Sequence, residues 1–109
     1  MALWHVTLTL GGDEMPEAAV LSALRRLADE QPFLLSGRYS TERAELRYWE
    51  EAADCQDAAA LALRLWGEHR ASAGLPAWRV VGLEIVDEAV HRARGAAAPM
   101  VAVGGWRPF

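Results

Sequence analysis

The sequence contains no lysine, no asparagine and a single cysteine, Cys55. One cysteine excludes an intramolecular disulfide and is compatible with a reducing compartment, so we expect a cytoplasmic protein. The first ten residues lack the basic segment of a signal peptide, and no apolar run approaches the length of a membrane span. The sequence therefore predicts no association with a membrane.

Basic charge is also scarce. All 11 basic residues are arginine, and the 15 acidic residues bring the net charge to −4. Nucleic-acid binding requires a concentrated basic surface, so no nucleic-acid partner is expected. The histidines at positions 5, 69 and 91 are too widely spaced for a zinc motif. We expect neither a metal nor another cofactor.

One short motif invites a functional interpretation. The stretch Gly11-Gly12-Asp13-Glu14 resembles the first four letters of the GGDEF signature of diguanylate cyclases. In those enzymes the motif lies on a hairpin of a longer domain, whereas here it joins a predicted strand to a predicted helix. We interpret it as a glycine turn before an acidic helix start. A phosphate site of backbone N–H groups is disfavoured, because Asp13 and Glu14 would repel the anion.

Hydrophobic periodicity predicts six elements. Apolar residues alternate with a period of two in four segments, which predicts strands at 3–10, 33–39, 44–51 and 78–87. Helical spacing predicts helices from about Pro16 to Glu30 and from Asp54 to about Gly74. The order βαββαβ is the pattern of the ferredoxin-like α+β fold: a four-stranded antiparallel sheet, order 4-1-3-2, with two helices on one face.

The register of the central hairpin can be argued from its turn. A turn at residues 40–43 places Tyr39 opposite Ala44 and Arg38 opposite Glu45. The alternation then predicts seven positions buried under the helices: Trp4, Val6, Leu8, Leu46, Val81, Leu83 and Ile85.

The predicted domain covers residues 1–94, and residues 95–109 form an extended C-terminal tail. The tail has a strand-like segment at 100–103 and an aromatic end, so we expect it to dock on the domain. With its arginine-only basic residues and abundant alanine, the chain resembles the small uncharacterised single-domain proteins of high-GC actinobacteria. No motif connects it to a named family.

The sheet face away from the helices is the candidate site. The predicted registers gather an ionic group at one end: His5, Arg38, Glu45, Arg47 and Glu84. They gather an apolar group at the other end: Thr9, Leu34, Trp49, Trp78 and Val80. Exposed apolar patches mark partner or ligand surfaces. We therefore expect a homodimer, formed through this open face or an edge strand, that acts as an interaction or small-ligand-binding module.

Two alternatives stay open. The chain could be a small cofactor-independent enzyme of the dimeric α/β barrel type, with His5 as a general base whose imidazolium is favoured by Glu84 or Glu45. It could also be a subunit that works only with a larger partner protein. An enzyme requires a closed pocket around His5, whereas an interaction module leaves that region flat or buries it against a partner.

Overall fold

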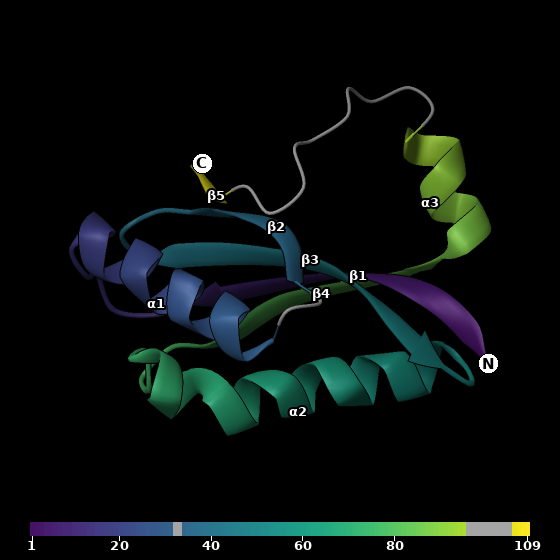
Figure 1. Cartoon of the computed structure of the whole chain (residues 1–109), viewed down its shortest axis with the longest axis horizontal. Helices are drawn as coiled ribbons and strands as arrows, with labels where there is room; N and C mark the ends of the chain where they lie inside the picture. Colours follow the sequence, from purple (N-terminus) through teal and green to yellow (C-terminus); the bar gives the residue numbers. More distant parts are fainter. Residues whose placement is uncertain (32–33, 96–105) are drawn as a thin grey trace.

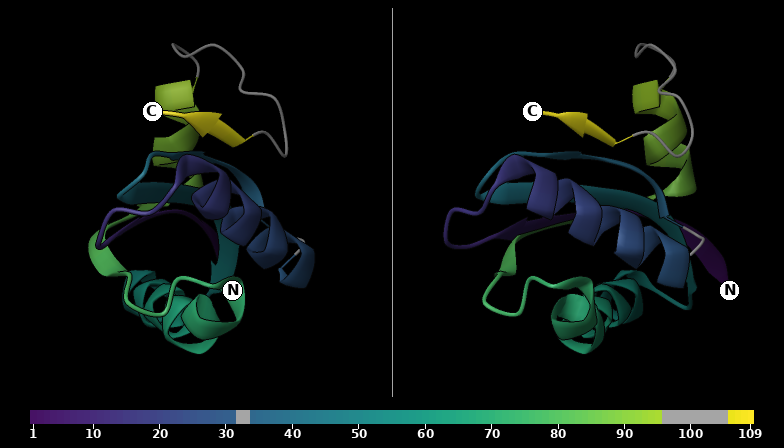
Figure 2. Two further views of the ribbon diagram at one scale, coloured as in Figure 1. Left: turned by 90° about the vertical axis from the view of Figure 1, so that its left-hand side faces the viewer. Right: turned by 60° about the vertical axis from the view of Figure 1, so that its left-hand side comes forward.

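The computed structural model describes residues 1–31, 34–95 and 106–109, and shows a mixed α+β domain. The elements in chain order are β1 (Ala2–Gly11), α1 (Glu17–Glu30), β2 (Leu34–Tyr39), β3 (Arg43–Ala52), α2 (Cys55–Ala73), β4 (Arg79–Asp87), α3 (Glu88–Gly95) and β5 (Trp106–Pro108). Figures 1 and 2 show α1 and α2 on one face of the sheet and α3 on the other. We call this second face the open face.

The sheet has five strands in the order β4-β1-β3-β2-β5. The first four are antiparallel neighbours in the predicted order. The prediction of a four-stranded, wholly antiparallel sheet is wrong, because β5 pairs with β2 in parallel. The end of the tail, β5, docks here since Gly37 has no side chain and leaves room for the Trp106 ring. The strand predicted at 100–103 lies outside the described residues.

Local sequence signals explain α2 well. The Asp54 side chain accepts a hydrogen bond from the Asp57 backbone N–H at 2.8 Å, which satisfies one of the free donors at the helix start. Gly74 ends the helix with a φ of 95°, a conformation that favours glycine. Trp66 is buried on the sheet-facing side of the helix, and its Nε1–H donates to the Trp78 carbonyl at 3.0 Å.

The start of α1 differs from the prediction. The helix begins at Glu17, and only that acidic residue lies in its first turn. Asp13 and Glu14 belong to the connection from β1, so they do not form an acidic helix start. The reason is Pro16, which takes the N-cap position with an extended ψ of 136°.

The core lies between the sheet and the pair α1 and α2. Three predicted core residues, Val6, Leu8 and Leu46, are fully buried, which confirms the predicted core face of β1 and β3. The predicted grouping along these strands is wrong, because His5 pairs with Trp49 and Thr9 pairs with Glu45. Trp4 is half-buried and its Nε1–H donates to the Ala52 carbonyl at 3.2 Å. Ile85 is half-buried and packs against the core.

The prediction for β4 is wrong at two positions. Val81 is 49% exposed and Leu83 is 36% exposed. The pairing of β1 with β4 shifts by one residue between Thr9 and Leu10, which is a β-bulge. The bulge places Val80 against the core and leaves Val81 on the open face. Leu83 faces the helices but lies on an edge strand, which has a neighbour on one side only.

The predicted hairpin register is confirmed, since Tyr39 pairs with Ala44 and Arg38 with Glu45. The boundary between residues 94 and 95 stays a prediction, although α3 continues to Gly95. In the part of the chain that the structure describes, no helix combines the length and the apolar character needed to cross a membrane.

Candidate functional site

His5 lies at one end of the open face, surrounded by aromatic rings. It sits on β1 opposite Trp49 of β3 and Val86 of β4, and is only 8% exposed. The His91 ring from α3 stacks on the His5 ring with centroids 3.9 Å apart and planes at 23°. Trp49 meets His5 edge-on at 5.1 Å and 76°. We call His5, Trp49 and His91 the imidazole cluster.

Helix α3 is placed over this end by its own sequence. The Asp87 carboxylate accepts the Val90 N–H at 2.7 Å and so caps the helix. An ion pair of 2.9 Å between Arg94 and Glu84 connects the last turn to β4. In Figure 1, α3 rises from the sheet on the side opposite α1 and α2. His91 therefore covers His5 from the solvent side.

A cleft of about 220 Å³ opens beside the imidazole cluster. We call it the imidazole cleft. It is lined by two imidazoles, two guanidinium groups, a carboxylate, a hydroxyl and one aliphatic side chain, from His5, His91, Arg47, Arg94, Glu84, Thr7 and Val86. Hydrogen-bond donors and acceptors thus converge on one small space.

The His5 imidazole is uncharged at neutral pH. Its pKa is lowered from 6.5 to about 4, mainly by burial and to a smaller extent by the positive charges of His91 and Arg47, while Glu84 opposes the shift. Glu84 therefore favours the imidazolium as expected, but burial outweighs it, and Glu45 is not among the groups that shift this pKa. Glu45 on β3 is paired with Thr9 on β1, and Thr9 is four residues along β1 from His5.

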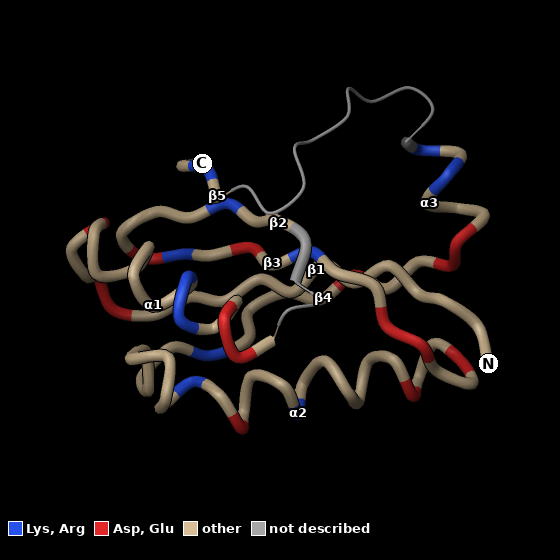
Figure 3. The backbone as a smooth tube through the Cα atoms, in the orientation of Figure 1, with Lys and Arg blue, Asp and Glu red and all other residues tan. Residues whose placement is uncertain are grey.

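Glu45 instead neutralises two arginines of the open face. Its carboxylate lies 3.3 Å from the Arg38 guanidinium and 2.9 Å from that of Arg47. Figure 3 shows that positively and negatively charged residues alternate along β3. The Arg38 guanidinium also lies 5.1 Å from the Phe109 ring centre, which connects this ion-pair group to the C-terminal end.

The two tryptophans expected at the apolar end lie elsewhere. Trp49 is at the His5 end, and Trp78 is 1% exposed in the core, where its Nε1–H donates to the Asp13 carbonyl at 3.1 Å. Val80 also packs on the core. The side chain of Leu34 lies outside the described part of the chain. The bulge in β4 turns Trp78 and Val80 to the core, and the pairing of β1 with β3 puts Trp49 opposite His5, so the described residues do not form the predicted apolar end.

Of the seven predicted site residues, the structure brings together His5, Arg47, Trp49 and Glu84. Arg38 and Glu45 lie next to this group, and Trp78 is far from it in the fold. Sequence reasoning missed His91 and Arg94, because nothing in a two-turn helix indicates which sheet face it will cover.

Sequence reasoning also missed Glu50. Glu50 lies an even number of residues from Leu46 and Tyr48 on β3, so it shares their core-facing side of the strand. This alternation was the signal in the sequence that could have identified it. Burial raises the pKa of its carboxyl group. Glu50 lines a cleft of about 190 Å³ on the helix side, with Arg64 and His69 of α2 among its neighbours.

Among the described residues, no three histidine, cysteine, aspartate or glutamate side chains are grouped as a metal site requires. The fold and the imidazole cleft define a small α+β domain with a polar site on its open face. The chain belongs to the family described as Domain of unknown function (DUF8830), which matches residues 3–101. This range includes every residue of the imidazole cleft. Comparison with curated proteins gives no match.

Proposed function

We propose that this protein is a small-ligand-binding module of ferredoxin-like fold that uses the imidazole cleft as its site. The observation that supports this function is the convergence of an uncharged, nearly buried imidazole with the polar groups of Thr7, Arg47 and Glu84. Ligand sites are concave and combine a few converging polar groups with groups of shifted pKa.

The cleft favours a small polar ligand. Its volume of about 220 Å³ is below the range of about 300–1,000 Å³ that is usual for drug-sized molecules. A neutral imidazole offers one donor and one acceptor, and the Thr7 hydroxyl can act as either. Arg47 and Arg94 each already face a carboxylate, so the ligand has no large uncompensated charge to neutralise.

The test is an NMR titration with a panel of small carboxylic acids, amides and amines. We expect saturable shifts of the Thr7 amide and the His5 ring signals for at least one compound. Thr7→Val should weaken its binding by about 3- to 10-fold, the value of one hydrogen bond. Thr9→Val is the matched control, because Thr9 lies on the same strand outside the cleft. No saturable shift, or equal affinity in Thr7→Val, would contradict the proposal.

The enzymatic alternative has less support. A general base works best with a pKa near the working pH, whereas burial and neighbouring groups hold the pKa of His5 at about 4. The stacked His91 ring also covers one face of the imidazole. Binding without chemistry is the better account of this arrangement.

Self-association remains part of the proposal, with the interface at the β4 edge. The opposite edge of the sheet, β2, is covered by β5 from the same chain, whereas the outer edge of β4 has no neighbour among the described strands. This strand also has exposed apolar side chains, with Val81 on the open face and Leu83 on the helix face. An exposed apolar edge strand is a template for pairing with another chain. We propose a second copy of the chain as that partner and the cytoplasm as its location.

Light scattering of paired variants tests the interface. Leu83→Lys should convert a dimer to a monomer, because an edge lysine opposes strand pairing. Leu63→Lys is the control, since Leu63 is 49% exposed on α2. An unchanged mass in Leu83→Lys, or a monomeric unmodified chain, would rule out this edge as the interface.

A further inference from the structure

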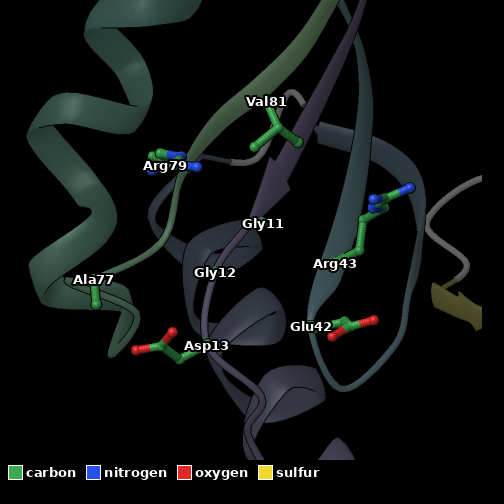
Figure 4. A pocket seen from close by; sticks show the side chains of 8 residues that line it. All are labelled: Gly11, Gly12, Asp13, Glu42, Arg43, Ala77, Arg79 and Val81. Atoms are coloured by element: carbon green, nitrogen blue, oxygen red, sulfur yellow. The ribbon is translucent and has the colours of Figure 1, made fainter.

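A second and larger cleft lies at the other end of the open face, beyond the site of the proposed function. It has a volume of about 450 Å³ and is shown in Figure 4. We call it the arginine cleft. Its lining comes from the end of β1, the β2–β3 turn and the start of β4, and comprises Gly11, Gly12, Asp13, Glu42, Arg43, Ala77, Arg79 and Val81.

Two arginines flank a glycine in this cleft. Gly11 on the central strand pairs with Arg43 on one side and with Arg79 on the other, so both arginines share its face of the sheet. Neighbouring strands are about 4.8 Å apart, which puts the two arginine Cα atoms about 10 Å from each other. Figure 4 shows the side chains on opposite sides of Gly11. Flexible arginine side chains can span that gap to one ligand.

Neither guanidinium has a partner within the described part of the chain. Arg38, Arg47, Arg92 and Arg94 all form ion pairs with glutamates. Arg43 and Arg79 form no ion pair or side-chain hydrogen bond with a described residue. Unpaired guanidinium groups keep all their donors available, and their planar geometry matches that of phosphate oxygens.

The walls of the cleft are held together by the backbone. Gly12 N–H donates to the Glu42 carbonyl at 3.2 Å and connects the end of β1 to the hairpin turn. The Trp78 indole donates to the Asp13 carbonyl at 3.1 Å and connects the start of β4 to the same segment. A ligand would therefore meet a cleft that is already formed, which lowers the cost of ordering it on binding.

Two carboxylates also line the cleft. Figure 4 shows Asp13 and Glu42 nearer the loop end, on opposite sides of the Gly12 segment. Neither forms an ion pair with Arg43 or Arg79 among the described contacts, so they do not occupy the guanidinium donors. At this position they are suited to accept hydrogen bonds from an ammonium or hydroxyl group of the same ligand.

We propose that the arginine cleft binds the oxyanion of a small organic phosphate, held between the guanidinium groups of Arg43 and Arg79. The rest of the ligand carries ammonium or hydroxyl groups that face Asp13 and Glu42. The Gly12 backbone N–H does not take part in this site, because it already donates to the Glu42 carbonyl. The volume of about 450 Å³ suits a ligand of this size.

The test uses inorganic phosphate and O-phosphoethanolamine as probes in an NMR titration of the full chain. We expect saturable shifts of the Gly11, Gly12 and Val81 amides with both probes. O-phosphoethanolamine should bind more tightly, because its ammonium group meets the carboxylates. Arg43→Gln and Arg79→Gln should each weaken binding about tenfold, as expected for the loss of a charge-assisted hydrogen bond.

Arg25→Gln is the matched control, since Arg25 is an exposed arginine of α1 outside the cleft. It should leave the affinity unchanged. Thr7→Val should also leave phosphate binding unchanged, which separates this site from the imidazole cleft. The proposal is overturned if the amides show no saturable shift, or if the Arg43→Gln/Arg79→Gln double variant binds both probes like the unmodified chain.

Discussion

The two ends of the open face are built from the same three strands, β1, β3 and β4, yet they differ in burial and in charge pairing. At the His5 end, α3 covers the sheet, the imidazole is 8% exposed and the neighbouring arginines face glutamates. At the Gly11 end no described helix covers the face, and Arg43 and Arg79 have no partner among the described residues. The presence of α3 at one end and its absence from the other therefore account for this difference more than the sheet does.

The difference has an electrostatic consequence. A covered site removes the imidazole from water, so the charged form of His5 becomes costly and its pKa falls to about 4. An uncovered site keeps its guanidinium groups solvated and charged. This difference underlies our two proposals, a neutral polar ligand at the first end and the oxyanion of an organic phosphate at the second. Four predictions test this comparison.

The largest effect should come from the titration of His5. Because its folded pKa of about 4 is below the unfolded value of 6.5, the unfolded chain binds the proton more readily, and stability is lost as pH falls through this range. The expected contribution is about 3 kcal/mol between neutral pH and pH 4. His5→Phe keeps a ring in the cluster without a proton site. Urea unfolding across this range should show a smaller acid loss for the variant, and equal losses would contradict the pKa.

The next effect concerns the wall of the arginine cleft. A Cβ atom at Gly12 would lie 2.5 Å from Trp78 Cδ1, so Gly12→Ala should destabilise the fold by about 1–3 kcal/mol through overpacking. Gly67→Ala is the opposite case, because nothing lies within 4 Å of its Cβ position in α2. That control should stabilise by about 0.5–1 kcal/mol. Chemical unfolding that gave the same sign for both variants would contradict the close contact.

A smaller effect should separate the charges around His5. Arg47→Gln should raise the pKa of His5, because Arg47 lowers it, and Glu84→Gln should lower that pKa further, because Glu84 raises it. NMR titration of the His5 ring measures both shifts. Shifts of the same sign in the two variants would contradict the opposite effects of Arg47 and Glu84 on the pKa of His5.

The smallest effect is expected at the uncovered end. Arg79→Gln should change the free energy of unfolding by no more than about 0.5 kcal/mol without ligand, because an exposed side chain without a partner contributes little. Thermal unfolding in phosphate-free buffer provides the measurement. A large loss of stability would mean that Arg79 supports the fold, and the contrast between the two ends would disappear.

Much of the fold was predictable from local signals. The turn at 40–43 determined the pairing of Arg38 with Glu45, and Asp54 and Gly74 marked the ends of α2. Alternation in β1 and β3 identified Val6, Leu8 and Leu46 as core residues. These features depend on period, caps and turns, which a few neighbouring residues encode.

The sequence by itself determined the order of the first four strands and the register of β2 against β3, and it assigned His5, Arg47 and Glu84 to one face of the sheet. Only the tertiary structure decided what covers that face. The bulge near Val80 moved Trp78 into the core, Gly37 admitted Trp106 beside β2, and α3 placed His91 on His5. Each of these outcomes depends on how distant side chains pack against one another, and periodicity within a single element carries no information about that packing.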